Sequence, residues 1–148
     1  MAAAMIHLEH PSEEMWEVRR RWFEQKAEPP DDGGYLVSEQ ACALAADLQC
    51  AFCAGAWIAV IVLAAAAIDA HLHDAECCTG NAKCAIDEAV ADPQLHKLRQ
   101  RRNALIHSNP DSPAITVDQQ WSERLTLEGD ARLAVDLVFR VFYASTSV

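Results

Sequence analysis

The chain has 148 residues, of which 51% are hydrophobic, so it is long enough for one globular domain with a substantial core. Its 22 acidic residues outnumber its 12 basic residues and give a formal net charge of −10, which excludes non-specific coating of nucleic acid. Alanine, the best helix former, is abundant, so the composition predicts an all-α helical bundle.

Apolar residues recur at helical spacing through most of the chain. They predict six helices, at about residues 12–25, 38–53, 57–73, 82–91, 93–108 and 129–144. Residues 29–34 are expected to form a turn-rich loop, Gly55 to separate the second and third helices, and residues 109–127 to be irregular or a small hairpin. We predict a single domain in which residues 1–35 supply an N-terminal helix and loop and residues 36–148 supply the bundle.

The stretch of residues 48–68 carries no charged side chain and reaches the length that spans a lipid bilayer. It is rich in alanine, however, and contains Gly55 and Trp57. Its flanking residues are Asp47 and Asp69 rather than lysine or arginine. The pattern therefore favours a helix buried on all sides in a bundle, and we expect no membrane association.

The six cysteines, two of them adjacent, do not resemble a disulfide framework, and the N-terminus lacks the basic and apolar regions of a secretory signal. We therefore expect free thiols and a cytoplasmic protein. Cysteine and histidine side chains suit zinc, and the set that would supply them is Cys50, Cys53, His71, His73, Cys77, Cys78 and Cys84. Because Cys50 and Cys53 fall inside an apolar helix, we expect no metal and no cofactor.

The best-defined predicted helix begins with Asp92 as N-cap and Pro93 in the first helical position, and it ends before Asn109-Pro110. An apolar stripe runs along it, formed by Leu95, Leu98, Leu105 and Ile106. Arg102 lies in the middle of this stripe, where a permanent charge costs several kcal/mol unless an anion meets it. The sequence therefore indicates that Arg102 has a function beyond packing.

Arg102, Asn103 and His107 lie near the end of this helix and offer the groups needed for acid–base chemistry on a phosphate. An arginine holds a phosphate with a bidentate fork, and a histidine titrates near neutral pH. An asparagine one turn before the histidine can fix its ring or hold a hydroxyl. These groups suffice for attack of a ribose 2′-hydroxyl on the neighbouring phosphate, without a metal if the arginine stabilises the developing charge.

The run Leu98-Arg99-Gln100-Arg101-Arg102-Asn103-Ala104-Leu105-Ile106-His107 resembles the signature of the HEPN superfamily, an arginine followed by a polar residue and, a few positions on, a histidine. The two helices before it, separated at Ala54-Gly55, also resemble the family's first two bundle helices. The resemblance implies a four-helix up-and-down bundle, here with additional short N-terminal and connecting helices. It also implies a homodimer around the motif and metal-independent endoribonuclease activity in a toxin–antitoxin, phage-defence or RNA-processing system.

Carried over residue by residue, Arg102 and His107 match the catalytic pair of the family and Asn103 matches its polar position. We expect Lys97, Arg99 and Arg101 to bind RNA in a basic trench. Arg102 of one chain is expected to act beside His107 of the other, because one bundle alone would bury Arg102 without an anion. Toxins that a partner nucleotidyltransferase inactivates carry a tyrosine two residues after the histidine, and here that residue is Asn109.

Two other interpretations stay open at this point. The runner-up to the ribonuclease is a non-catalytic HEPN-like module that binds a nucleotide or a protein such as an antitoxin. The third is a small zinc-binding or structural helical protein, for which the cysteine and histidine set would supply the ligands. A second basic cluster, Arg19 to Arg21, lies beside Trp16 and Trp22, and such aromatic side chains can stack on RNA bases. Aromatic residues at helical spacing are more typical of a core, which is the reading we favour.

Overall fold

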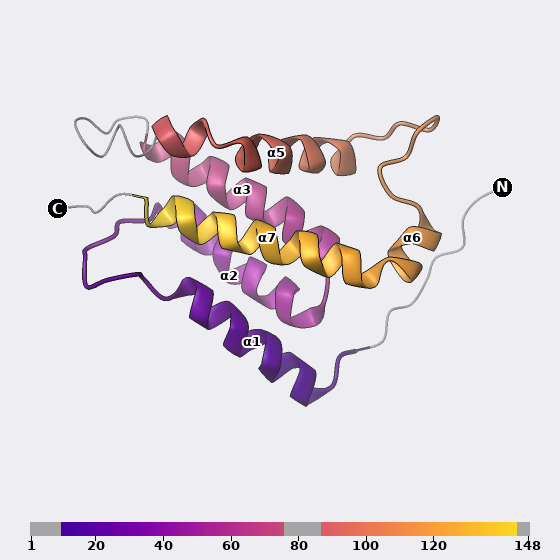
Figure 1. Cartoon of the computed structure of the whole chain (residues 1–148), viewed down its shortest axis with the longest axis horizontal. Coiled ribbons are helices and arrows are strands. Elements are labelled where there is room, and N and C mark those ends of the chain that lie inside the picture. Colours follow the sequence, from indigo (N-terminus) through magenta and orange to yellow (C-terminus); the bar gives the residue numbers. More distant parts are fainter. Residues whose placement is uncertain (1–9, 76–86, 145–148) are drawn as a thin grey trace.

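A computed structural model describes residues 10–75 and 87–144 of the chain, and within these ranges the regular structure is entirely helical (Figure 1). The predicted helical bundle is therefore confirmed at this level. The helices are α1 (Glu13–Ala27), α2 (Glu39–Ala54), α3 (Trp57–Ala75), α5 (Pro93–Ile106), α6 (Val117–Ser122) and α7 (Arg124–Phe142). Residues 87–90 are also helical, and the rest of the helix predicted over 82–91 lies outside the described residues.

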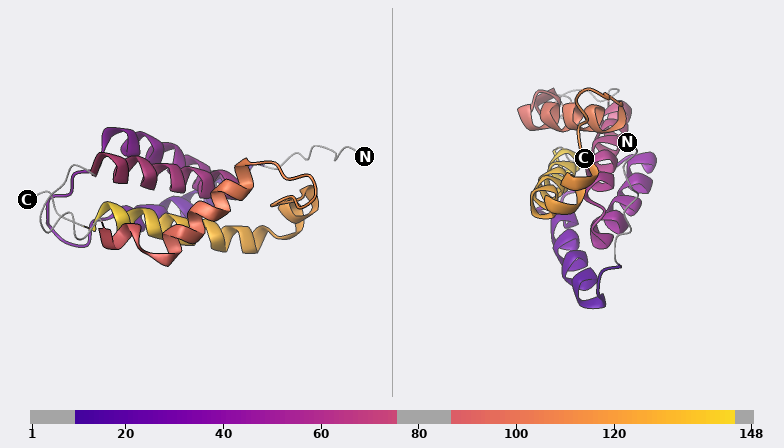
Figure 2. Two further views of the ribbon diagram at one scale, coloured as in Figure 1. Left: turned by 90° about the horizontal axis from the view of Figure 1, so that it is seen from above. Right: turned by 90° about the vertical axis from the view of Figure 1, so that its right-hand side faces the viewer.

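Helix α3 is the centre of the bundle, because α2, α5 and α7 all pack against it. Helix α1 packs on α2 and α7, at the opposite edge of the bundle from α5 (Figures 1 and 2). Alanines at positions 64, 65 and 67 of α3 are fully buried, and small side chains allow neighbouring helices to approach closely. The largest fully buried side chains are Trp57, Phe52, Leu48, Ile61, Ile68 and Leu95.

Local capping chemistry fixes the beginnings of three helices where the sequence predicted them. Ser12, Ser38 and Asp92 each accept a backbone N–H bond in the first turn of α1, α2 and α5. Gly55 ends α2 with φ of 75°, a left-handed conformation that glycine adopts without steric cost. The uncharged stretch of residues 48–68 is therefore broken at Gly55 and belongs to two helices.

The region between α5 and α7 differs from the prediction. Residues 109–127 contain α6 and the first turn of α7 rather than a hairpin or a wholly irregular loop. The side chain of Thr116 accepts a bond from the backbone of Gln119, and the side chain of Gln119 accepts one from the backbone of Thr116. This capping box starts α6. Helix α7 then begins at Arg124, five residues before its predicted start at 129, so Gly129 is an interior position.

Within the described part of the chain, one helical segment, Trp57–Asp74 of α3, is long and apolar enough to cross a membrane. Half of this segment is buried inside the bundle. A core helix of a soluble protein has the same length and composition, so the structure is compatible with a soluble protein.

The buried His71 of α3 gives the bundle a pH-sensitive position. It is 8% exposed, its ring lies 5.1 Å from that of Phe142, and its Nδ1 has no hydrogen-bond partner among the described residues. Burial lowers the pKa of His71, and the nearby charge of Asp74 only partly opposes that effect.

We expect the free energy of unfolding to fall as the pH drops below about 6.5, the pKa of a histidine in an unfolded chain. The unfolded chain then binds a proton that folded His71 does not. The contribution of neutral His71 to the free energy of unfolding is fully present above this pH. It is lost as the pH falls toward the lower pKa of folded His71, by up to about 1.4 kcal/mol per pH unit. Urea unfolding across this range measures the effect, and His71→Leu should reduce the slope. An unchanged slope in that variant contradicts the assignment to His71.

Candidate functional site

The candidate site is built around Asp69, a carboxylate near the C-terminal end of α3 that binds two arginines of α5. Arg102 places Nη1 at 2.6 Å from Oδ2 of Asp69. Arg99 places Nη2 and Nε at 2.7 and 2.8 Å from Oδ1. The side chains of Asp69 and Arg99 are 33% exposed and that of Arg102 is 21% exposed, so solvent screens these ion pairs only in part.

This contact corrects the premise that one chain buries Arg102 without an anion. The anion is Asp69 of the same chain, so a second chain is not needed to neutralise Arg102. No local pattern indicates the pair, because Asp69 is 33 residues from Arg102 and also fits a solvated helix end. Asp69 is therefore the site residue that sequence reasoning missed.

Arg102 retains binding capacity despite these contacts. Its Nε donates to Oδ1 of the exposed Asn103 at 3.0 Å, and its Nη1 donates to Asp69. A guanidinium has five N–H groups, so about three remain for another acceptor. One carboxylate between two guanidiniums also leaves a formal net charge of +1 on the group of Asp69, Arg99 and Arg102. An anion is therefore still attracted to this end of α5.

The sequence predicts His107 in the last turn of a helix over residues 93–108. In the structure α5 ends at Ile106, and His107 is the residue directly after it. Its backbone N–H donates to the carbonyl of Asn103 at 3.0 Å and closes the helix, and its backbone is extended with φ −106° and ψ 117°. The residue is exposed, and its imidazole contacts no hydrogen-bonding partner in the described ranges. Both ring nitrogens are therefore available to a substrate.

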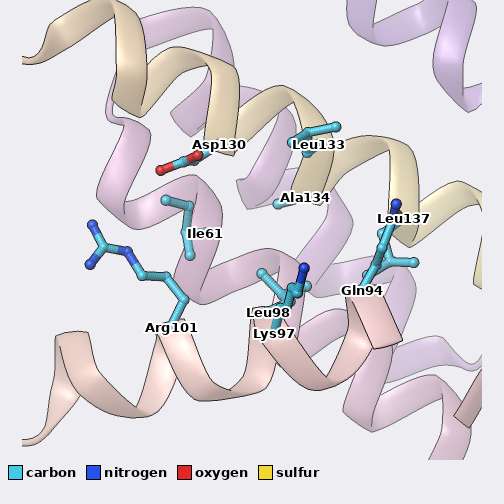
Figure 3. Close-up of a pocket in the computed structure, with 9 residues that line it drawn as sticks. All are labelled: Ile61, Gln94, Lys97, Leu98, Arg101, Asp130, Leu133, Ala134 and Leu137. Carbon is cyan, nitrogen blue, oxygen red and sulfur yellow. The ribbon is translucent and has the colours of Figure 1, made fainter. Parts of the chain in front are cut away.

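The three residues predicted to bind RNA lie on two faces of α5. Arg99 faces Asp69, whereas Lys97 and Arg101 line a groove of about 330 Å³ between α5 and α7 (Figure 3). We call it the α5/α7 groove, and its lining is Ile61, Gln94, Lys97, Leu98, Arg101, Asp130, Leu133, Ala134 and Leu137. Arg101 also donates from Nη1 to the carbonyl of Ala114 at 3.2 Å. The expected single basic trench is thus divided within one chain.

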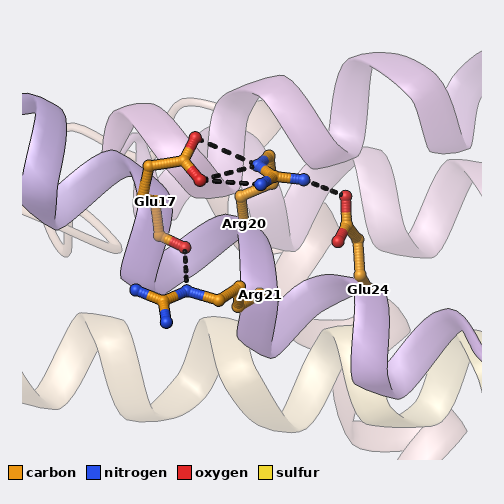
Figure 4. Close-up of polar contacts among 4 residues, drawn as sticks. All are labelled: Glu17, Arg20, Arg21 and Glu24. Carbon is orange, nitrogen blue, oxygen red and sulfur yellow. Dashed lines mark hydrogen bonds and ion pairs between the residues drawn. The ribbon is translucent and has the colours of Figure 1, made fainter.

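The second basic cluster, on α1, is engaged in contacts within the chain. Figure 4 shows Arg20 between Glu17 and Glu24. Its nitrogens lie 2.7 Å from a Glu17 oxygen and 2.6 Å from a Glu24 oxygen, and the hydrogen bonds from Arg20 to Glu17 hold the pKa of Glu17 below its usual value. Arg21 donates from Nε to the carbonyl of Glu17. Arg19 turns inward instead. It donates to the carbonyl of Cys53 and lies 4.9 Å from the ring centre of the buried Trp57. Arg19 therefore stabilises the corner between α2 and α3, whereas the hydrogen bonds of Arg20 and Arg21 to Glu17 and Glu24 stay within α1.

The cysteine and histidine set does not converge in the described residues. Cys53 is buried at the end of α2, close to Trp57 at the start of α3. His71 lies on α3, 14 residues after Trp57 and therefore far from Cys53. At 1.5 Å per residue this separates the two by about 20 Å. Among the residues that the structure describes, no group of three or more potential metal ligands is found. Cys77, Cys78 and Cys84 lie outside them.

The Asp69 contacts lead to a stability prediction. Asp69→Asn should lower the free energy of unfolding by about 1–2 kcal/mol, because two partly buried guanidiniums lose their counter-charge, an effect discounted here for partial exposure. Urea unfolding measures the change. Asp47→Asn on α2 is the matched control, because Asp47 is exposed and contacts no partner in the described chain. Equal stability of the two variants would mean that the Asp69 pairs contribute nothing.

Comparison with known proteins adds no family to these observations. No family model matches the chain, and no curated protein or solved structure matches it significantly. The HEPN resemblance therefore depends on the motif and on the two predicted helices before it, and a function for the chain has to be argued from the site.

Proposed function

We propose that the chain is a metal-independent endoribonuclease of HEPN type, with His107, Arg102 and Asn103 as its catalytic residues. The observation that carries the proposal is the end of α5. There Asp69 and Asn103 both bind the guanidinium of Arg102, and His107 follows one turn later with a free imidazole. An oriented guanidinium and an exposed histidine at one helix end are the two groups that cleavage through the 2′-hydroxyl requires.

In the proposed reaction, neutral His107 takes the proton of the ribose 2′-hydroxyl, and the 2′-oxygen attacks the adjacent phosphorus. The bond from phosphorus to the 5′-oxygen breaks, that oxygen takes up a proton from solvent, and His107 returns the proton it accepted to solvent. The products are a 2′,3′-cyclic phosphate and a 5′-hydroxyl. The N–H groups of Arg102 that Asp69 and Asn103 leave open stabilise the additional negative charge on the phosphate oxygens.

Asp69 has a positioning role in this scheme. Fixing a long arginine side chain in one geometry costs conformational entropy. The ion pair with Asp69 already holds Arg102 in one geometry, so substrate binding does not have to order this side chain. Since Asp69 supplies the anion within the chain, we propose that each chain carries a complete set of catalytic residues. Arg99 binds the same carboxylate and adds positive charge to the site. We assign it no direct contact with the reacting phosphate.

The alternative proposal is a non-catalytic HEPN-like module that binds a nucleotide or a protein. One observation favours it. Two N–H groups of Arg102 are occupied by Asp69 and Asn103, which reduces the donors available to a transition state. A site that only binds an anion needs fewer donors than one that stabilises a transition state.

The two proposals are separated by an RNA cleavage assay with end-group analysis. The ribonuclease proposal expects single-stranded RNA to be cut in the presence of EDTA, and DNA to survive because it lacks the 2′-hydroxyl. Intact RNA that is nevertheless bound by the protein supports the module. A strict requirement for a divalent cation would overturn the metal-independent mechanism.

We also propose the kind of biological system in which this ribonuclease acts. A small acidic ribonuclease whose cationic side chains are concentrated on α5 suits a cytoplasmic toxin–antitoxin or phage-defence system, in which a protein partner such as an antitoxin limits cleavage. Asn109 stands where a modifiable tyrosine follows the histidine in some toxins, so control by nucleotidyl transfer to that position is not proposed here.

A further inference from the structure

Two opposite charges face the same end of the α5/α7 groove without binding each other. Figure 3 shows Asp130 on the α7 wall and Arg101 on the α5 wall, with Ile61 between them in this view. Arg101 donates to the carbonyl of Ala114 rather than to Asp130, and Asp130 has no ion-pair partner among the described residues. A carboxylate and a guanidinium therefore border one space, each with unused hydrogen-bonding capacity.

The floor of the groove is apolar. Leu98, Ala134 and Leu137 line it and are at most 8% exposed, whereas Leu133 at the rim is 64% exposed. The volume of about 330 Å³ falls within the range of small-molecule sites, about 300–1,000 Å³. A flat ring can lie on this floor and against Leu133 while its polar edges reach the two charged walls.

Guanine is the nucleobase whose edges match these walls. Its N1–H and N2–H groups are adjacent and donate together to the two oxygens of one carboxylate, and its O6 and N7 accept from an arginine or a lysine. Adenine and cytosine place an acceptor nitrogen beside their single amino group, and uracil has one N–H between two carbonyls. Each of these three bases would therefore lose one bond to Asp130 and turn a lone pair toward its carboxylate.

The groove lies beside the end of α5 that carries the proposed catalytic residues. Arg101 directly precedes Arg102, and the two side chains leave the helix about 100° apart, so the groove is a neighbouring pocket rather than part of the group around Asp69. Lys97 is four residues before Arg101 on the same wall and has no ion-pair partner in the described chain. It can therefore bind a phosphate of a nucleotide held in the groove.

We propose that the α5/α7 groove is a base-recognition subsite for an unpaired guanine of single-stranded RNA. Asp130 accepts from N1–H and N2–H of the base, and Arg101 donates to O6 and N7. This inference rests on the proposed ribonuclease function, because it assigns a base to the substrate of that enzyme. The edge that Asp130 reads is the one that pairs with cytosine, so a guanine within a duplex is not recognised.

Binding of oligonucleotides that cannot be cleaved tests the subsite separately from catalysis. The probes are fluorescent single-stranded 2′-O-methyl RNAs, which have no 2′-hydroxyl, with one guanine, inosine or adenine in a uridine tract. Fluorescence anisotropy should give the guanine probe about tenfold tighter binding than the other two, because inosine lacks the N2 amino group and adenine lacks both donors. Equal affinity for the three probes, or no binding of any, overturns the proposal.

Asp130→Asn tests the residue that reads the base. This variant should lose most of the preference for guanine, because an amide has one acceptor oxygen where the carboxylate has two. Asp47→Asn is the matched control, since Asp47 is also exposed but lies on α2, outside the groove. Circular dichroism checks that both variants fold. A guanine preference that persists in Asp130→Asn, or that is lost equally in Asp47→Asn, overturns the assignment.

Two further measurements distinguish this subsite from its alternatives. Guanosine monophosphate should compete with the guanine probe only at much higher concentration, because it lacks the phosphates on either side. Equal affinity of the two would make the groove a site for a free nucleotide and would overturn the RNA assignment. Guanine-selective binding without cleavage of ordinary RNA would support the subsite and contradict the proposed ribonuclease function instead.

Discussion

Replacing His107 with alanine should reduce RNA cleavage by about 10²–10⁴-fold, the usual contribution of a general acid–base group. The 2′-hydroxyl would lose the base that removes its proton, while Arg102 and its contacts with Asp69 and Asn103 stay in place. The measurement is the single-turnover cleavage rate of a labelled single-stranded RNA. Because His107 is exposed and follows the helix, the melting temperature should change little.

His96→Ala is the matched control for this change. His96 is also an exposed histidine of α5, but it lies near the beginning of the helix rather than at its end. Its variant should cleave at the wild-type rate. Wild-type cleavage by the His107 variant, or an equal loss in both variants, would remove His107 from the mechanism.

Replacing Arg102 with alanine should slow cleavage by about 10²–10³-fold, the effect of removing one donor to a developing oxyanion. Arg102→Lys should recover only part of the rate, because an ammonium keeps the charge but loses the planar fork that reaches Asp69 and the phosphate together. The rates are measured with the same RNA, and urea unfolding tests whether the fold is retained.

Arg21→Ala provides the control for net charge. It removes one positive charge from an exposed arginine of α1 whose hydrogen bond, among the described residues, goes to the backbone carbonyl of Glu17 in its own helix. If the Arg21 and Arg102 variants lose the same fraction of activity, Arg102 acts only through net charge and its oriented contacts are irrelevant.

The parts of the fold that follow local chemistry could be predicted from the sequence. Ser38 and Asp92 cap helices because a short polar side chain there bonds a free backbone N–H, and Gly55 ends α2 because its φ is positive. The capping box of Thr116 and Gln119 was a readable signal of α6 as well. A segment of only six residues that follows two prolines carries too little apolar periodicity to indicate a helix, so the capping box is its one local signal.

What could not be predicted depends on contacts between distant residues. Arg124 begins α7 and donates from Nη2 to the carbonyl of Gly55 at 2.5 Å, a contact across 69 residues that no local pattern contains. The pairing of Asp69 with Arg99 and Arg102 spans α3 and α5 in the same way. The motif residues were therefore visible in the sequence, but the group that holds Arg102 in place was not.

The central claim is that this chain cleaves RNA through the ribose 2′-hydroxyl. Its most direct test is a pool of DNA oligonucleotides that contain a single ribonucleotide in randomised flanking sequence, incubated with the protein in EDTA and analysed by mass spectrometry. We predict cleavage only after the ribonucleotide, with a 2′,3′-cyclic phosphate on one product and a 5′-hydroxyl on the other. Cleavage elsewhere, 3′-hydroxyl ends, or intact oligonucleotides throughout the pool would contradict the claim.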